Sequence, residues 1–142
     1  MEKILFVCTG NTCRSPMAEA IFNDLCQKNK INKFSESAGI YPDEGSNASR
    51  YAVAVCQELS INIAAHRARP VSTVRLDEYH LFYVMGPRHR HALISLGVDP
   101  EKIYILNNKN GGISDPYGAD IEVYRKCRDE IYDSIKKEIL NL

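Results

Sequence analysis

Eight residues close to the N-terminus carry the side chains best suited to chemistry, in the order Cys8-Thr9-Gly10-Asn11-Thr12-Cys13-Arg14-Ser15. The apolar run at 4–7 precedes them and predicts a buried strand, and a helix-forming stretch that begins at Pro16 follows them. A short loop between a strand and a helix N-terminus turns backbone N–H groups inward and binds anions well. The sequence therefore predicts a phosphate-sized anion site with a cysteine at its base.

Cys8 is the candidate nucleophile of this loop. Arg14 offers a fork of donors that matches two phosphate oxygens. The helix N-terminus, the inward N–H groups and the guanidinium all favour a thiolate, so we expect the pKa of Cys8 to fall. Ser15 can donate a hydrogen bond to that thiolate, and Gly10 is expected to adopt backbone angles forbidden to other residues. The reaction implied is attack of sulfur on phosphorus, followed by hydrolysis of a phosphocysteine.

Two less specific interpretations of the loop stay open at this level. A cysteine that follows a buried strand is often an inert core residue, and a Cys-x4-Cys pair occurs in metal half-sites. The metal interpretation is weak, because the other cysteines and the histidines are scattered, at Cys26, Cys56, Cys127, His66, His80, His89 and His91. The run at 88–91, which holds two of these histidines, is interpreted as the solvated start of a helix.

Asp115 is the candidate general acid. Attack on a phosphate monoester or phosphoramidate is slow unless the departing group is protonated, so a carboxylic acid is needed within reach. Asp115 lies on a loop after the expected fourth strand, where the chain returns to the sheet edge that carries Cys8, in the segment Ser114-Asp115-Pro116-Tyr117-Gly118. Taken alone, an Asp-Pro pair is typical of an ordinary turn. Coupled with the Cys8 loop, it favours an acid that later acts as base toward water.

Strand-like and helix-like segments alternate along the chain and position these loops. The expected strands are 3–7, 33–37, 81–85 and 103–106, and the expected helices are 16–28, 47–59, a short 72–77, 88–96 and a last helix from about 119 or 120 to 140. This alternation predicts an α/β fold of three layers, with a four-stranded parallel sheet and helices on both faces. In such sheets ligands bind beyond the carboxyl ends of the strands, where the Cys8 loop begins.

The composition bounds the class of protein. With 142 residues, 44% of them hydrophobic, the chain is expected to form one domain, residues 1–142. Eighteen basic residues balance eighteen acidic ones, so no general attraction to nucleic acid or to anionic membranes is expected. No apolar run approaches a membrane span, no signal-peptide pattern begins the chain, and five cysteines lack the spacing of a disulfide framework. These features predict a cytoplasmic protein.

The motifs together resemble those of the low-molecular-weight protein tyrosine phosphatases, over almost the whole chain. The resemblance is carried by the Cys-x5-Arg-Ser loop, Ser37-Ala38-Gly39, His66-Arg67-Ala68-Arg69 and Asp115-Pro116-Tyr117-Gly118. It implies a sheet of flavodoxin-like winding and no metal or organic cofactor. It also implies that Cys8 is the nucleophile, Arg14 the phosphate clamp and Asp115 the general acid and base. The remaining loop residues would contact substrate or shape the loop, with Ser37 and His66 in support: Thr9, Gly10, Asn11, Thr12, Cys13 and Ser15.

Thr12 narrows the expected substrate. Tyrosine-specific relatives carry a branched aliphatic residue at this position, whereas the run 7–19 is similar to that of bacterial protein-arginine phosphatases with threonine there. A threonine hydroxyl can orient a water molecule or contact a guanidinium, although the same side chain can simply face solvent. We therefore favour phosphoarginine in proteins, with phosphotyrosine as the main alternative. The expected pocket walls are Ile40 and Tyr41 on one side and Tyr117 on the other.

Cys13 lies five residues from Cys8 on the same loop. The resemblance favours a disulfide between the two cysteines when peroxide oxidises the reactive thiolate, over a simple space-filling role for Cys13.

Two other functional classes are weaker interpretations of the sequence than a phosphatase. An arsenate reductase needs further cysteines around residues 80–90, and residues 79–91 contain none. A non-catalytic phosphate-binding module would not need Cys8, Arg14 and Asp115 together. The expected partners are phosphorylated proteins and inorganic phosphate, and the expected state is a monomer.

Overall fold

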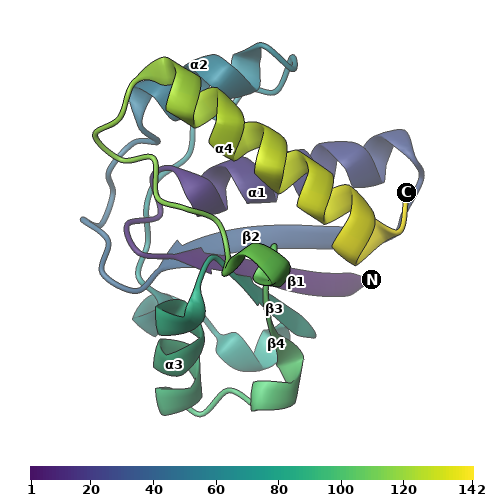
Figure 1. The fold of residues 1–142 in the computed structure, drawn as a ribbon. Helices are drawn as coiled ribbons and strands as arrows, with labels where there is room; N and C mark the ends of the chain where they lie inside the picture. Colours follow the sequence, from purple (N-terminus) through teal and green to yellow (C-terminus); the bar gives the residue numbers. More distant parts are fainter.

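A four-stranded parallel sheet forms the centre of the protein, whose residues 1–142 are all described by a computed structural model (Figure 1). The strands are β1 (Glu2–Cys8), β2 (Lys33–Gly39), β3 (Leu81–Val84) and β4 (Ile103–Ile105). They lie side by side in the order β2-β1-β3-β4, and every pair is parallel. This order is the flavodoxin-like winding, so the predicted fold class is confirmed.

Helices cover both faces of the sheet (Figure 1). The helices are α1 (Arg14–Lys28), α2 (Arg50–Gln57), α3 (Pro87–Ser95) and α4 (Ile121–Ser134), which continues as a π-helical segment at Ile135–Leu140. One face carries α1, α2 and α4, and the other carries α3 with the 3₁₀ turns at Val71–Thr73 and Leu76–Glu78. Two further 3₁₀ turns, Pro100–Lys102 and Asn108–Asn110, flank β4. None of the helices is both long and apolar enough to cross a membrane.

Strand β1 is apolar on both sides because both faces of the sheet are covered. Ile4 and Phe6 pack into the core beneath α1 and α4, whereas Leu5 and Val7 pack into the core beneath α3. Side chains alternate along a strand, so Cys8 falls on the same side as Phe6. The reactive residue is therefore aimed at the layer that contains α1.

Three of the predicted helices differ from the structure. The helix predicted at 47–59 begins only at Arg50, because Asn47 still pairs with Arg67 as an antiparallel bridge. The short helix predicted at 72–77 is two separate 3₁₀ turns. In contrast, α1 begins at Arg14 rather than at Pro16, which places the end of the Cys8 loop inside the first helical turn. Because of this earlier start, Arg14 and Ser15 are the first two residues of α1.

Candidate active site

The loop between β1 and α1 opens at the carboxyl edge of the sheet. Cys13 is the N-cap of α1, and no side chain caps the first turn. The first N–H groups of a helix have no partner within the helix, so here they are available to an anion bound in the loop. Pro16 in this turn has no N–H to satisfy.

The loop takes its shape from Asn11 and Gly39 rather than from Gly10. Asn11 adopts the left-handed conformation, with a φ of 55°, which asparagine tolerates better than most residues. A Cβ on Gly39 would lie 2.6 Å from the carbonyl oxygen of Thr9, so β2 can approach the loop only with glycine there. Gly10 is not among the glycines with a positive φ, and a Cβ on it would make an ordinary contact, 3.7 Å from Thr12 Oγ1. The expectation that Gly10 supplies special backbone angles is therefore wrong.

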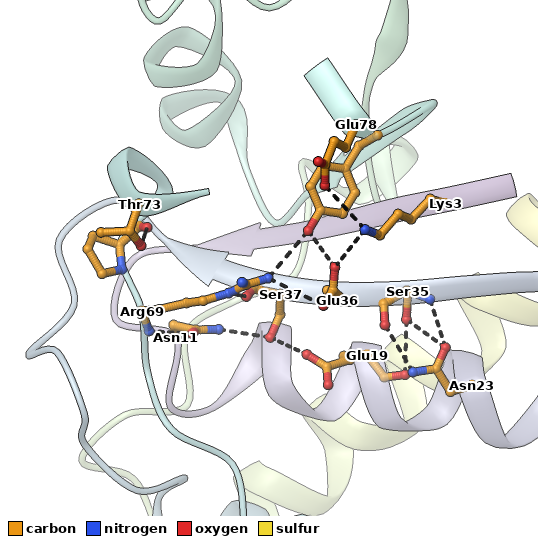
Figure 2. Close-up of polar contacts among 12 residues, drawn as sticks. Lys3, Asn11, Glu19, Asn23, Ser35, Glu36, Ser37, Arg69, Thr73 and Glu78 are labelled. Atoms are coloured by element: carbon orange, nitrogen blue, oxygen red, sulfur yellow. Dashed lines mark hydrogen bonds and ion pairs between the residues drawn. The ribbon is translucent and has the colours of Figure 1, made fainter. Parts of the chain in front are cut away.

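Asn11 is fully buried and organises the loop from within. Its Nδ2 donates to Ser15 Oγ at 2.8 Å and to Ser37 Oγ at 3.0 Å. Its Oδ1 accepts from the backbone N–H of Arg69 at 3.0 Å, as Figure 2 shows. His66 Nε2 lies 2.7 Å from the carbonyl oxygen of Asn11. The structure thus brings both predicted supporting residues, Ser37 and His66, into contact with the loop.

The polar network extends from Ser37 in two directions (Figure 2). Ser37 Oγ donates to Glu19 Oε1 on α1 at 2.6 Å, and burial raises the pKa of this carboxyl. Arg69 donates from Nε to the carbonyl oxygen of Ser37 at 3.0 Å and from Nη2 to Tyr79 at 3.4 Å. The Tyr79 hydroxyl in turn donates to Glu36 Oε1 at 2.6 Å. These contacts connect the loop to α1, to β2 and to the segment before β3.

Cys8 is buried, and its Sγ lies 2.8 Å from Ser15 Oγ. Because that oxygen accepts from Asn11, its hydroxyl hydrogen is free to donate to the sulfur. Burial raises the pKa of the Cys8 thiol, while the Ser15 hydrogen bond, the Arg14 charge and the N–H groups of Ser15 and Asn11 act to lower it. The stabilising groups are those expected, but the predicted net fall in the pKa is wrong, because desolvation of the buried sulfur outweighs them.

Arg14 and Asp115 meet at the mouth of the loop. Arg14 is only 7% exposed, and its Nη1 donates to the carbonyl oxygen of Ile113 at 2.9 Å. Its Nη2 lies 3.7 Å from Asp115 Oδ2, whose side chain is half-exposed. Asp115 Oδ1 accepts from the backbone N–H of Tyr117 at 3.1 Å, the turn expected of an Asp-Pro segment. The loop between β4 and α4 therefore brings the candidate acid to the Cys8 loop.

A pocket of about 460 Å³ lies over the loop, a volume typical of sites for small ligands. Its lining combines the loop with residues that follow β2 and β4: Cys8, Thr9, Gly10, Asn11, Thr12, Cys13, Arg14, Asp43, Ser46, Asn47, Ser49, Asp115 and Tyr117. Every predicted catalytic residue lines it, and Ser15 lies directly beneath it against Cys8.

One predicted wall of the pocket is absent. Tyr41 is 80% exposed and is not part of the lining, and Ile40 packs against the core beneath α3. The wall on this side instead comes from the polar residues of the segment after β2, Asp43, Ser46, Asn47 and Ser49. This segment consists of turn-forming residues, and its sequence does not indicate which of its side chains face the Cys8 loop. Tyr117 lies on the opposite loop and lines the pocket as predicted.

Three further polar contacts at the loop involve Cys13 and His89. Cys13 Sγ lies 3.3 Å from Ser49 Oγ and 3.4 Å from the Tyr124 hydroxyl, and both loop cysteines are free thiols. His89 is 7% exposed, with Nε2 lying 2.9 Å from Thr9 Oγ1. The interpretation of 88–91 as a solvated helix start is therefore wrong at His89, since the third residue of α3 turns toward the sheet.

Comparison with known proteins agrees with this geometry. Residues 3–141 match the family model described as low molecular weight phosphotyrosine protein phosphatase. A protein-arginine-phosphatase of Geobacillus stearothermophilus is 38% identical over 134 residues, which are 91% of this chain and 88% of that protein. A crystal structure of a low molecular weight protein tyrosine phosphatase from T. tengcongensis is also 38% identical, with 100% of both chains covered and a TM-score of 0.93. A cysteine-to-serine mutant of the arginine phosphatase YwlE, solved with a phosphorylated active-site serine, is 30% identical with a TM-score of 0.87, covering 97% of this chain and 98% of that one.

Proposed function

Because this chain belongs to the low molecular weight phosphotyrosine protein phosphatase family, and is therefore a protein phosphatase, we propose that it hydrolyses phosphoarginine in proteins. The observation that carries this proposal is the chemistry of the pocket wall. Besides the general acid Asp115, the pocket lining holds one further carboxylate, that of Asp43, and a single aromatic ring, that of Tyr117. A guanidinium is a planar cation that carboxylates bind well, whereas a phenyl ring is best held by apolar and aromatic groups. The identity to a protein-arginine-phosphatase supports the same substrate.

The proposed reaction has two steps and uses Cys8 as the nucleophile. In the first, Cys8 reacts as the thiolate, the form that Ser15, Arg14 and the loop N–H groups favour. The sulfur–phosphorus bond forms as the phosphorus–nitrogen bond of phosphoarginine breaks, and Asp115, acting as the general acid, gives a proton to the departing nitrogen. Arg14 and the loop N–H groups hold the phosphoryl oxygens. In the second, the Asp115 carboxylate takes a proton from water, the water oxygen attacks phosphorus, and Cys8 leaves as a thiolate stabilised by Ser15. The phosphorylated serine of the YwlE mutant supports a covalent intermediate.

Phosphotyrosine is the second candidate substrate. The Tyr117 ring, which is 77% exposed at the pocket, offers one face for stacking against a phenyl group. The T. tengcongensis structure is that of a protein tyrosine phosphatase, which also favours this candidate. A single comparison of substrates separates the two.

The test compares kcat/KM on matched phosphoarginine and phosphotyrosine peptides for the parent protein and for Thr12→Ile. We expect the parent to prefer phosphoarginine, and the added bulk and lost hydroxyl to shift the ratio toward phosphotyrosine by about tenfold or more. Thr12→Val keeps the shape of threonine, so it separates the hydroxyl from the bulk. A parent that prefers phosphotyrosine, or a ratio that Thr12→Ile leaves unchanged, contradicts the proposed substrate.

Asp43→Asn tests the wall directly. Removing this carboxylate should lower kcat/KM on the phosphoarginine peptide by about fivefold to tenfold, because a charge-assisted contact with the guanidinium is lost. The phosphotyrosine peptide should be unaffected. Glu44→Gln, which removes the charge of an exposed neighbour outside the pocket lining, is the matched control. Equal losses on both peptides would mean that Asp43 does not select the substrate.

We further propose that Cys13 protects Cys8 from irreversible oxidation. Both cysteines line one pocket as free thiols, which supports this role. Peroxide would oxidise the Cys8 thiolate to a sulfenic acid, and the Cys13 thiol would displace water from it to form a disulfide. Activity lost to peroxide should then return with added thiol in the parent and not in Cys13→Ser. Full recovery of Cys13→Ser would show that Cys13 has no protective role.

The remaining proposals concern the setting of the enzyme. The nucleophile, clamp and acid all come from one chain and supply the chemistry themselves, which supports a monomer of one domain that needs no metal or cofactor. An odd number of cysteines favours a reducing compartment, and so a cytoplasmic location with phosphorylated proteins as substrates. The two weaker classes, arsenate reductase and non-catalytic module, gain no support from relatives that are phosphatases by name.

A further inference from the structure

His89 is the one residue with a buried side-chain nitrogen that has no hydrogen-bond partner. It lies in the first turn of α3 and is 7% exposed. Its Nε2 lies 2.9 Å from Thr9 Oγ1, while Nδ1 is the unpaired atom. His89 therefore makes its one side-chain hydrogen bond to Thr9, the residue next to the nucleophile.

The unpaired Nδ1 determines which way the hydrogen bond runs. Buried N–H groups are very rarely left without an acceptor, so Nδ1 carries no proton and the neutral ring has its proton on Nε2. The ring is neutral because burial lowers the pKa of His89 to about 4, with Arg14 and Arg88 acting in the same direction and Asp115 against it. Nε2–H therefore donates to Thr9 Oγ1.

Thr9 is held from two sides of the sheet edge. Its carbonyl oxygen accepts from the backbone N–H of Tyr41 at 3.0 Å, beside the close approach of Gly39. Its side-chain hydroxyl is bound by His89, which lies on α3 on the other face of the sheet from α1. Asn11 holds the middle of the loop through Ser15 of α1, Ser37 of β2 and the backbone of Arg69, and the last two contacts are drawn in Figure 2. None of these three residues belongs to α3. The contact with His89 is thus the link between the loop and α3.

We propose that His89 is a positioning residue of the phosphatase: by donating to Thr9 it ties the phosphate loop to α3 and fixes the loop N–H groups in the orientation that binds a phosphoryl group. The proposal rests on the assignment of the Cys8 loop as the phosphate site and is independent of the preference for arginine. A loop anchored in both helical layers is already in its binding shape, so less ordering is needed when phosphate enters.

The test is a double-mutant cycle on His89 and Thr9 with an aryl phosphate as substrate, which any member of this phosphatase class should hydrolyse. His89→Leu and Thr9→Val each remove the hydrogen bond and should raise the inhibition constant of inorganic phosphate and lower kcat/KM by about fivefold to tenfold. The double variant should be no worse than either single one, because the two changes remove one contact. His89→Gln keeps an N–H donor near the position of Nε2 and should restore the parent values.

Thermal unfolding of each variant separates positioning from general stability. Thr9→Val lies on the loop and keeps the side-chain shape, so the test holds even where His89→Leu folds poorly. The proposal is overturned where the two single effects multiply in the double variant, where His89→Gln is as impaired as His89→Leu, or where Thr9→Val leaves phosphate inhibition unchanged. If the parent protein did not hydrolyse the aryl phosphate at all, that result would instead contradict the assignment of the Cys8 loop as the phosphate site.

Discussion

Ser15 is the residue that acts most directly on the charge of Cys8. Its hydroxyl lies 2.8 Å from the sulfur and accepts from Asn11, which leaves its hydrogen for the thiolate. Burial works against ionisation of this thiol, so each group that lowers the pKa of Cys8 matters more than it would at the surface. The hydrogen bond from Ser15 is the largest of those lowering influences.

Ser15→Ala should therefore raise the pKa of Cys8 further. The rate of alkylation by iodoacetamide, followed against pH, should shift to higher pH, and kcat should fall by about tenfold because the thiolate is also a poorer leaving group in the second step. Ser35→Ala removes another buried serine, one that bonds to Asn23 and not to the loop, and is the matched control. An unchanged alkylation profile in Ser15→Ala would contradict the role of this hydroxyl.

At the scale of single residues, the sequence predicts the chemistry of the site better than its walls. Cys8 and Arg14 lie close together because only a short loop separates Cys8 from the first turn of α1, which contains Arg14. Asp115 joins them because parallel strands end at one edge of the sheet. Asp43 lines the pocket and Tyr41 does not, because of the path that the polar segment after β2 takes. The spacing of residues along the sequence does not determine that path.

Among the elements, β2 has a second task beyond pairing with β1. Its last residue, Gly39, pairs with Cys8 in register and leaves room for the carbonyl oxygen of Thr9. A sequence pattern shows only a small residue at the end of a strand. The close approach that requires glycine arises from the packing of β2 against a loop distant in sequence, so it cannot be predicted from local periodicity.

Gly39→Ala should distort the phosphate loop, because the new Cβ would lie 2.6 Å from a backbone oxygen that cannot move without moving Thr9. We expect kcat/KM on an aryl phosphate to fall by at least about tenfold, with a loss of stability of about 1–3 kcal/mol from overpacking. Urea unfolding and steady-state kinetics measure the two effects. Gly86→Ala is the control, since its Cβ would come no closer than 4.0 Å to His89 Nδ1. Parent-like kinetics in Gly39→Ala would contradict the argued contact.

The starts of α1 and α2 show where prediction of elements fails. Pro16 suggested the first helical residue, yet the helix begins at Arg14, because the loop itself curls into the first turn. The helix predicted from 47 is delayed to Arg50 by pairing between Asn47 and Arg67, residues far apart in sequence. In both cases tertiary contacts set the boundary and propensity sets only the type of element.

At the scale of the whole molecule, the site is the meeting point of two helical layers. The α1 layer supplies Arg14 and Ser15 together with the Asn11 network, and the α3 layer supplies His89. A neutral, buried histidine between these layers also links the stability of the fold to pH. His89 has a pKa of about 4 in the folded chain, against an ordinary value of 6.5.

The sign of this pH effect follows from the direction of the shift. Between pH 6.5 and 4 the unfolded chain binds a proton at this position and the folded chain does not, so the free energy of unfolding falls as the pH falls through that range. If the whole shift in the pKa of His89 were expressed, the free energy of unfolding would fall by at most roughly 3 kcal/mol over this range. Glu19 acts in the opposite direction, because its raised pKa favours proton uptake by the folded chain. The parent profile alone therefore does not isolate His89.

The difference between the parent and His89→Gln isolates the histidine, because glutamine keeps a donor and does not titrate. We expect the free energy of unfolding, measured by urea titration at several pH values from 7 to 4, to fall less steeply in His89→Gln than in the parent. His91→Gln, an exposed histidine on the same helix, should follow the parent curve. Parallel curves for the parent and His89→Gln would mean that the histidine is not held neutral between the layers, and the direction assigned to its hydrogen bond with Thr9 would fall with it.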